Sequence, residues 1–271
     1  MNLNFLRAIP LVRRFRYNYL KNWIEQHPQS DVISHIKGGL KMKLRVEDWV
    51  QQNIFLHGFY EENETYYLLN RSKTIKTFVD IGANVGYFSL LTSTNIGKNK
   101  GKIFSFEPIT RTFERLQENI YLNNINCINS YKIAISDTNT SLEINIGNDQ
   151  NWGMSSINKH DQLSSLSETV KCQTLDSFCD EHHITTIDLV KIDVEGAEFK
   201  VLKRMENVIK SYKPEILIEI IDSHLNQQGV SSSDIFNYLW SKGYRSYEIG
   251  NKGTLKEITK TGTYRGLVCF K

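Results

Sequence analysis

From residue 76 onward, short apolar runs alternate with stretches in which apolar residues recur every three to four positions. The first pattern is typical of buried strands and the second of amphipathic helices. "KTFVDI" (76–81) therefore predicts a strand, and residues 110–124 predict a helix on which Phe113, Leu116 and Ile120 share one face. Further strands are expected within 101–108, 127–135, 140–146, 186–194, 214–221, 244–249 and 263–270, and further helices within 84–97, 174–183, 196–212 and 231–243.

Two of these helices carry recognisable end signals. Gly97 is expected to stop the helix that begins near residue 84, because glycine commonly ends helices. Ser231 and Asp234 have the spacing of a capping box, and Gly243 follows as the stop signal.

Strands that alternate with helices predict an α/β fold with a doubly wound, mostly parallel sheet and helices on both faces. The two final strands have no helix between them, so we expect an antiparallel hairpin at one edge. Residues 1–75 differ: a helix precedes a β-rich piece (32–46) and an aromatic, acidic stretch (54–69). We interpret 1–75 as an N-terminal cap and 76–271 as the main domain.

Composition narrows the class of protein only moderately. A length of 271 residues suits one large domain with an appendage, and a net charge of +3 does not indicate nucleic-acid binding. The four cysteines form no C-x-x-C pair, which favours buried thiols and a reducing, cytoplasmic compartment. No apolar run approaches the roughly 18 residues of a spanning helix.

The N-terminus is basic and leaves two interpretations. One is a helix packed on the domain with a solvated basic face, which we favour; the other is peripheral contact with a membrane surface. Its apolar stretches are too short for a signal peptide. The basic residues that precede the first acid are Arg7, Arg13, Arg14, Arg16 and Lys21.

A glycine-containing loop follows the strand over 76–81. Open parallel sheets bind ligands at the carboxyl ends of their strands, where this loop places Asp80, Gly82, Asn84 and Gly86. Glu107 ends the next strand, the usual position of a carboxylate that accepts both ribose hydroxyls. The pattern therefore predicts a nucleoside site.

The loop favours a cationic nucleoside over a dinucleotide. The G-x-G-x-x-G fingerprint is absent, and Asp80 would face a pyrophosphate. Two like charges about 4 Å apart repel by roughly 4 kcal/mol at an effective dielectric near 20. S-adenosylmethionine carries an ammonium and a sulfonium and no phosphate, so it is the expected cofactor. Three alternatives stay open: a plain turn with Asp80 capping the next helix, a nicotinamide-dependent oxidoreductase using Glu107, and a non-catalytic nucleoside-fold module.

The strand over 186–194 ends in a second group of acids. Asp193, Glu195 and Glu198 lie close together at the turn into the next helix. Such clusters are candidates for raised pKa values and for chemistry. The alternatives are that Glu195 caps the helix and that Glu198 faces solvent or pairs with Lys191 or Arg204.

Several of these strings together resemble the FkbM-type methyltransferases. They are "FVDIGANVGYFS", "FSFEP", "TLDSF", "IDLVKIDVEGAEFKVL" and "PEILIEI", with "FLHGFYEENE" upstream. The resemblance covers residues 50–245, with a core at about 78–245. It implies a seven-stranded, Rossmann-like class I methyltransferase fold, S-adenosylmethionine as donor, and an oxygen of a sugar or natural product as acceptor.

The resemblance also implies roles for individual residues. Glu107 would hold the ribose, Ala134 would border the adenine, and Asp193 would lie beside the transferred methyl group. The methionine end would be held by Asp80, Gly82, Asn84 and Gly86.

Methyl transfer to a hydroxyl calls for a general base. The candidates are Asp193, Glu195, Glu219 at the end of "EILIEI", and His224 just beyond it. Asp193 with Glu219 or Asp222 has the oxygen ligands of a Mg²⁺ site, but no aspartate-rich motif is present, and we predict no metal.

Two aromatic segments are candidates for the walls of an acceptor pocket that takes a small molecule or glycan. The polar stretch 148–160 contains Trp152, and "FYEENETYY" spans 59–67. The alternatives are a surface loop anchored by its tryptophan and packing of the aromatics on the core.

Overall fold

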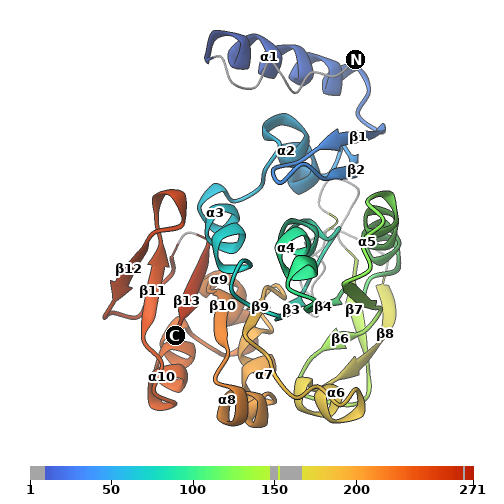
Figure 1. Ribbon diagram of the computed structural model, residues 1–271. Helices are drawn as coiled ribbons and strands as arrows, with labels where there is room; N and C mark the ends of the chain where they lie inside the picture. The colour runs from blue at the N-terminus through green and yellow to red at the C-terminus, as the bar shows by residue number, and fades with distance from the viewer. Residues whose placement is uncertain (1–9, 147–151, 153–166, 265) are drawn as a thin grey trace.

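The computed structural model describes residues 10–146, 152, 167–264 and 266–271. These residues form a central eight-stranded sheet with helices packed around it (Figure 1). The strand order is β12-β11-β13-β10-β9-β3-β4-β5. The pairs from β10 to β5 are parallel, and β13, β11 and β12 are antiparallel. The bounds are β3 Thr77–Ile81, β4 Lys102–Phe106, β5 Ile128–Tyr131, β9 Leu189–Ile192, β10 Glu215–Glu219, β11 Ser246–Ile249, β12 Leu255–Ile258 and β13 Leu267–Phe270.

The predicted doubly wound, mostly parallel α/β fold is confirmed. The sheet has one strand more than the seven expected, because residues 255–258 form the edge strand β12. The last two expected strands do pair with each other, but β13 also inserts between β10 and β11.

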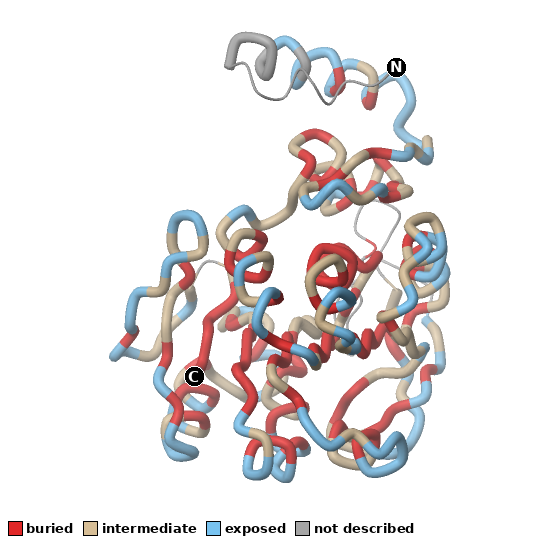
Figure 2. The backbone as a smooth tube through the Cα atoms, viewed as in Figure 1, coloured by how far each residue is buried: buried red, intermediate tan, exposed pale blue. Residues whose placement is uncertain are grey.

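Helices cover both faces of the sheet, as the alternating pattern requires (Figure 1). On one face lie α3 (Glu62–Arg71) and α4 (Tyr87–Lys98), which bury Leu68 and Leu90 against Phe78 and Leu189. The helices on the other face are α6 (Leu175–Glu181), α7 (Glu198–Lys203), α8 (Glu206–Tyr212) and α10 (Ser232–Ser241). The buried positions in Figure 2 gather along the strands and on the helix faces that meet them.

The helix ends agree only partly with the sequence patterns. The capping box of Ser231 and Asp234 is present at the start of α10. However, α4 continues through Gly97 to Lys98, and the stretch expected as one helix over 196–212 is divided into α7 and α8. The break lies at Met205, whose side chain is wholly buried in the core.

A second, three-stranded sheet lies beside β5. It contains β6 (Ala134–Ile135), β7 (Ser141–Asn145) and β8 (Ser167–Gln173). The apolar run 127–135 thus supplies strands to two sheets, and no pattern predicted β8. Ile144 and Val170 pack here against Ile109, the N-cap residue that precedes the helix α5 (Thr110–Leu122).

The N-terminal region adds a hairpin and helices. It contains α1 (Pro10–Gln26), β1 (Asp31–His35), β2 (Lys41–Arg45) and α2 (Trp49–His57). The stretch 54–69, expected only as aromatic and acidic, lies largely in α2 and α3. Leu20 and Ile24 of α1 pack on Val46 and Leu56, whereas α3 belongs to the main core. The side chains of Arg7, Arg13, Arg14 and Arg16 lie outside the described residues.

Within the described part of the chain, helices long and apolar enough to cross a membrane are absent.

Two loops meet closely at the carboxyl edge of the sheet. Gly82, after β3, has φ +76°, and a Cβ atom there would lie 1.8 Å from the carbonyl oxygen of Asp193, after β9. Only a residue without a side chain allows the two backbones to approach in this way.

We expect Gly82→Ala to lower the free energy of unfolding by about 3 kcal/mol or more, because a backbone atom must move. Gly39→Ala is the matched control: Gly39 has φ +85°, but no atom lies within 4 Å of its Cβ position. It should cost about 1 kcal/mol from backbone strain alone. Urea denaturation measures both, and equal losses would contradict the close-approach argument.

Candidate functional site

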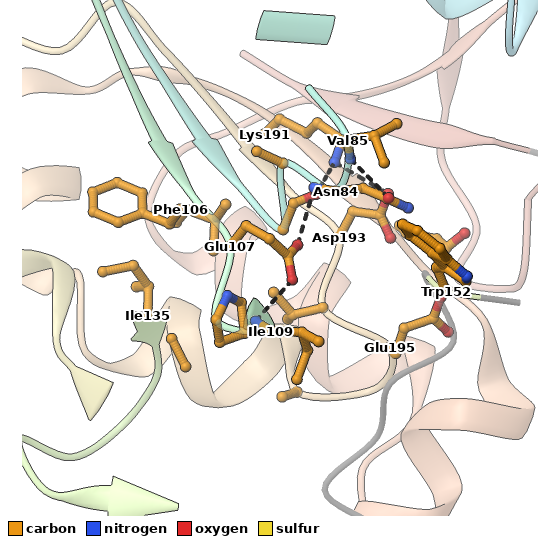
Figure 3. Close-up of a pocket in the computed structure, with 18 of the residues that line it drawn as sticks. Asn84, Val85, Phe106, Glu107, Ile109, Ile135, Trp152, Lys191, Asp193 and Glu195 are labelled. Carbon is orange, nitrogen blue, oxygen red and sulfur yellow. Dashed lines mark hydrogen bonds and ion pairs between the residues drawn. The ribbon is translucent and has the colours of Figure 1, made fainter. Parts of the chain in front are cut away.

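A cavity of about 280 Å³ opens at the carboxyl ends of β3, β4, β9 and β10 (Figure 3). Open parallel sheets bind ligands at this position. Among the residues that line the cavity are the sequence candidates Gly82, Asn84, Glu107, Ala134, Asp193, Glu195, Glu219 and His224.

The loop after β3 presents backbone to the cavity. Asn84 has a left-handed conformation (φ +51°), and its side-chain oxygen accepts a hydrogen bond from the Val85 N–H at 2.7 Å. Gly82 and Asn84 line the cavity, whereas Gly86 is not among the lining residues. Gly86 caps α4, where a Cβ atom would lie 2.4 Å from Leu116. Its role is therefore packing between α4 and α5.

Glu107 holds its carboxylate in a fixed orientation. One oxygen accepts the N–H of Asn84 at 3.0 Å and the other accepts the N–H of Ile109 at 3.1 Å. Burial raises the pKa of Glu107 to about 7, although these hydrogen bonds and Lys191 favour the ionised form. Each carboxylate oxygen keeps capacity for another hydrogen bond, so the group is suited to a pair of hydroxyls.

Asp80 lies behind the cavity wall. Its side chain is wholly buried, accepts a hydrogen bond from Ser89 Oγ at 2.5 Å, and lies 3.6 Å from Lys191 Nζ. The expectation that this carboxylate faces the ligand is therefore wrong for this structure. The reason is strand periodicity: Asp80 shares a face with Phe78, so it points toward α4.

Lys191 is a buried charge in the middle of β9. It lies directly opposite Asp80 across the strand pair. Its Nζ also lies 3.1 Å from Asp193 Oδ2 and donates to the carbonyl of Gly82 at 3.1 Å. Burial disfavours the ammonium, but Asp193 and Asp80 outweigh that effect and hold the pKa of Lys191 above its ordinary value. Of the two acids, only Asp193 lines the cavity.

The four candidates for a general base are brought to the same cavity. Glu195, Glu219 and His224 come from the turn after β9, the end of β10 and the helix α9 (Asp222–Leu225), and one ligand atom of each lies within 4.8 Å of the others. His224 Nδ1 lies 3.3 Å from Glu195 Oε2. This set of ligand atoms also suits a divalent metal ion.

Glu219 is the most perturbed acid of the site. Burial raises its pKa to about 10, with further contributions from Asp193, Glu195 and Glu198. A carboxyl group with a pKa this high keeps its proton at neutral pH, so Glu219 is not suited to accept a proton there.

Two other acids have structural partners. Glu198 is 2% exposed and accepts the N–H groups of Val194 and Gly196 at 3.1 and 3.0 Å, so it neither faces solvent nor pairs with Lys191 or Arg204. Asp222 accepts hydrogen bonds from Ser232 and Thr263.

Part of the apolar lining comes from β6, from the residue before it and from β7. Ala134, expected beside adenine, lies with Ile133 and Ile135, and Leu142 and Ile144 line the same cavity.

Sequence reasoning missed several residues of the site. Lys191 was considered only as a partner of Glu198, and Asp48 and Trp49 were not considered. Glu61 lies near Asp193 and Lys191, and burial raises its pKa to about 8. The string "FLHGFYEENE" (55–64) contains Glu61, but it marked the region without indicating which position matters.

The aromatic walls are partly observed. Trp152 lines the cavity and so does Tyr60, from the stretch 59–67. Residues 148–151 and 153–160 lie outside the described residues.

Comparison with known proteins matches residues 80–246 to the methyltransferase FkbM domain. "Methyltransferase 1" of Beauveria bassiana is 26% identical over 162 residues, covering 54% of this chain and 64% of that protein. "Hexuronic acid methyltransferase AglP" of Haloferax volcanii is 27% identical over 180 residues, covering 66% and 67%. The chain thus spans about two thirds of the length of these relatives. The solved structure of methyltransferase FkbM from Methylobacillus flagellatus KT is 18% identical with a TM-score of 0.46, covering 81% of this chain and 52% of that one.

The protonated state of Glu219 predicts a pH dependence of stability. In the unfolded chain a glutamate loses its proton above pH 4.5, whereas Glu219 keeps it up to about pH 10 when folded. Its contribution to stability is therefore fully present below pH 4.5 and decreases as the pH rises toward 10. Between pH 5 and pH 8 the native protein should lose about 4 kcal/mol more of its free energy of unfolding than Glu219→Gln does.

Chemical denaturation at the two pH values measures this difference. Glu257→Gln, on the exposed edge of the sheet, is the control and should follow the native protein. Parallel pH profiles for Glu219→Gln and the native protein would rule out a protonated Glu219.

Proposed function

Because the chain belongs to the FkbM family of methyltransferases, we propose that it transfers a methyl group from S-adenosylmethionine to a hydroxyl of a glycan or related polyol. One observation carries this proposal: a single cavity contains both the oriented carboxylate of Glu107 and the group formed by Glu195, Glu219 and His224. The first suits a ribose, and the second suits removal of a proton from a hydroxyl. Among the chain's relatives are a hexuronic acid methyltransferase and a 2-O-methyltransferase of Sinorhizobium fredii, NoeI, 29% identical over 117 residues, which cover 38% of this chain and 47% of NoeI.

In the proposed complex, Glu107 accepts hydrogen bonds from the ribose hydroxyls, and Ala134 and its apolar neighbours contact the adenine. The backbone of Gly82 and Asn84 borders the methionine end. Asp193 takes the role expected of Asp80, since it is the member of the Lys191 pair that lines the cavity. Its carboxylate attracts the cationic end of the cofactor.

S-adenosylmethionine, when bound, supplies an electrophilic methyl group on a sulfonium sulfur. The protein's part is to orient the acceptor hydroxyl for in-line attack and to accept its proton. His224 is the preferred base. Its Nδ1 lies 3.3 Å from Glu195 Oε2, so the Glu195 carboxylate would stabilise the positive charge that the imidazole gains when it accepts the proton. The other two acids are less suited to act as the base. Asp193 forms an ion pair with Lys191, and the raised pKa of Glu219 favours its protonated form at neutral pH.

A metal-assisted variant of the same reaction uses the same residues. The ligand atoms of Glu195, Glu219 and His224 are close enough to share a divalent cation, which would lower the pKa of a bound hydroxyl. Methyl transfer that is unchanged by a chelator favours His224 as the base, and methyl transfer that requires an added cation favours the metal.

Glu107→Gln should weaken binding of S-adenosylhomocysteine by about 2–4 kcal/mol, or roughly 30- to 1000-fold, because the charged acceptor of two ribose hydroxyls is lost. Isothermal titration calorimetry measures the affinity. Glu114→Gln, exposed on α5, is the control and should bind like the native protein. The proposed cofactor site fails if Glu107→Gln binds as tightly as the control, or if the native protein does not bind this ligand.

His224→Gln should lower the rate of methyl transfer by about 10²–10⁴-fold and leave the affinity for S-adenosylhomocysteine unchanged. Transfer of labelled methyl from S-adenosylmethionine to a panel of methyl glycosides measures the rate. His183→Gln, at an exposed position, is the control. A variant at position 224 that keeps more than about a tenth of the native rate would exclude His224 as the base.

A further inference from the structure

Three aromatic side chains line the cavity beside the proposed acceptor position. Trp49 begins α2, Tyr60 precedes α3, and Trp152 follows β7 in the chain. Trp49 is 57% exposed although it lines the cavity, so its ring borders the entrance; Trp152 is 8% exposed. An exposed tryptophan at a cavity entrance is a surface on which a ligand can bury apolar area.

One carboxylate connects the two tryptophans. Asp48 is 1% exposed and caps α2, where its Oδ1 accepts the N–H of Gln51 at 2.9 Å. Its Oδ2 accepts the N–H of Trp152 at 2.7 Å. The start of the helix that carries Trp49 and the backbone of Trp152 are therefore held by the same group, and their separation is set by the protein before any ligand arrives.

Trp152 is also held through its ring. The guanidinium carbons of Arg111 and Arg115 lie 5.0 and 5.5 Å from the ring centroid, within the range of cation–π attraction. These arginines are four residues apart on α5, so both contacts with the ring come from one helix. The two contacts hold the indole at the position where it lines the cavity.

Tyr60 joins this aromatic group to the acidic end of the cavity. Its ring lies edge-on to Trp49, with centroids 6.3 Å apart. Burial raises the pKa of its phenol, and the negative charges of Glu61, Asp193, Glu219 and Glu195 raise it further. The aromatic group therefore adjoins the residues proposed to act on the acceptor hydroxyl.

We propose that Trp49, Tyr60 and Trp152 form a stacking subsite for the ring of a carbohydrate acceptor, with Asp48 as the residue that positions the two tryptophans. The inference rests on the proposed function and names the part of the cavity that selects the acceptor. A sugar ring has a face of C–H groups, which buries apolar area against indole at about 25 cal/mol per Å². Its rim carries hydroxyls, which find hydrogen-bond acceptors in Glu195 and His224. An unsubstituted acyl chain has no hydroxyls for these groups and forgoes these hydrogen bonds, each worth about 0.5–1.5 kcal/mol.

The test uses saturation-transfer difference NMR on the full chain with saturating S-adenosylhomocysteine. The probes are methyl α-D-glucopyranoside, methyl α-D-mannopyranoside and methyl α-L-rhamnopyranoside, with octanoate as the acyl-chain probe. In the native protein at least one glycoside should show transfer to its ring C–H protons. In Trp49→Ala and Trp152→Ala this signal should fall at least about five-fold, while the calorimetric affinity for S-adenosylhomocysteine stays within about two-fold.

Tyr121→Ala is the matched control, because Tyr121 is an aromatic residue on α5 that is 84% exposed and is not among the residues lining the cavity. Asp48→Asn tests the positioning role. An amide has one acceptor oxygen in place of two, so the hold on either Gln51 or Trp152 is lost. The glycoside signal should fall as in Trp152→Ala at unchanged cofactor affinity; a residue that only stabilised the fold would not separate the two measurements.

The outcomes distinguish this inference from the proposed function. A native protein that does not bind S-adenosylhomocysteine overturns the proposed function itself. A native protein that binds it but shows no glycoside signal, or a signal for octanoate alone, overturns the carbohydrate subsite. A glycoside signal that survives Trp49→Ala also overturns it, and this variant changes an exposed side chain, so the test holds even if Trp152→Ala does not fold.

Discussion

The site depends on one buried ammonium, that of Lys191, enclosed between two carboxylates. A charge in the middle of a buried strand is costly unless it is paired, and Asp80 and Asp193 supply the pairing from the two sides of the β3–β9 junction. The same ammonium donates to the carbonyl of Gly82. Lys191 thus connects the loop after β3 with Asp193 after β9, and the absence of a side chain at Gly82 allows the two loops to lie close together.

The cavity next to this junction combines two chemical environments. Apolar residues of β6 and β7 and the oriented carboxylate of Glu107 suit a nucleoside. Carboxyl groups, an imidazole and aromatic rings suit a hydroxylated acceptor. The N-terminal region is part of this site, since Asp48, Trp49 and Tyr60 all come from it. The proposed methyl transfer requires both environments in one cavity, and the residues that line this cavity provide both.

Much of the fold and part of the site were predictable from local patterns. Periodicity identified β3, β9 and α5. The strand-end acids Glu107 and Asp193 line the cavity, and their roles toward a cofactor stay predictions. Asp80 was assigned to the wrong side of its strand, because the loop motif outweighed the two-residue alternation that puts it with Phe78. The argument that the negative charge of Asp80 would repel a pyrophosphate is weakened, because Lys191 lies beside Asp80 and offsets that charge. The choice of S-adenosylmethionine as cofactor therefore rests on family membership and on Glu107. Glu198 appeared free to face solvent because its partners are backbone N–H groups, which no side-chain pattern reveals.

The chain by itself determined which segments are strands, which end in acids, and which family the protein resembles, because these properties depend on residues close together in sequence. Tertiary structure decided which of those acids line the cavity, which groups they pair with, and how their pKa values are shifted. Asp48 and Trp152 are 104 positions apart and Lys43 and Asn119 are 76 apart, yet each pair shares a hydrogen bond. The raised pKa of Glu219 likewise comes from burial and from neighbours contributed by other segments. Desolvation and charge act through space, so their effects at this site exist only once the sheet has brought its strand ends together.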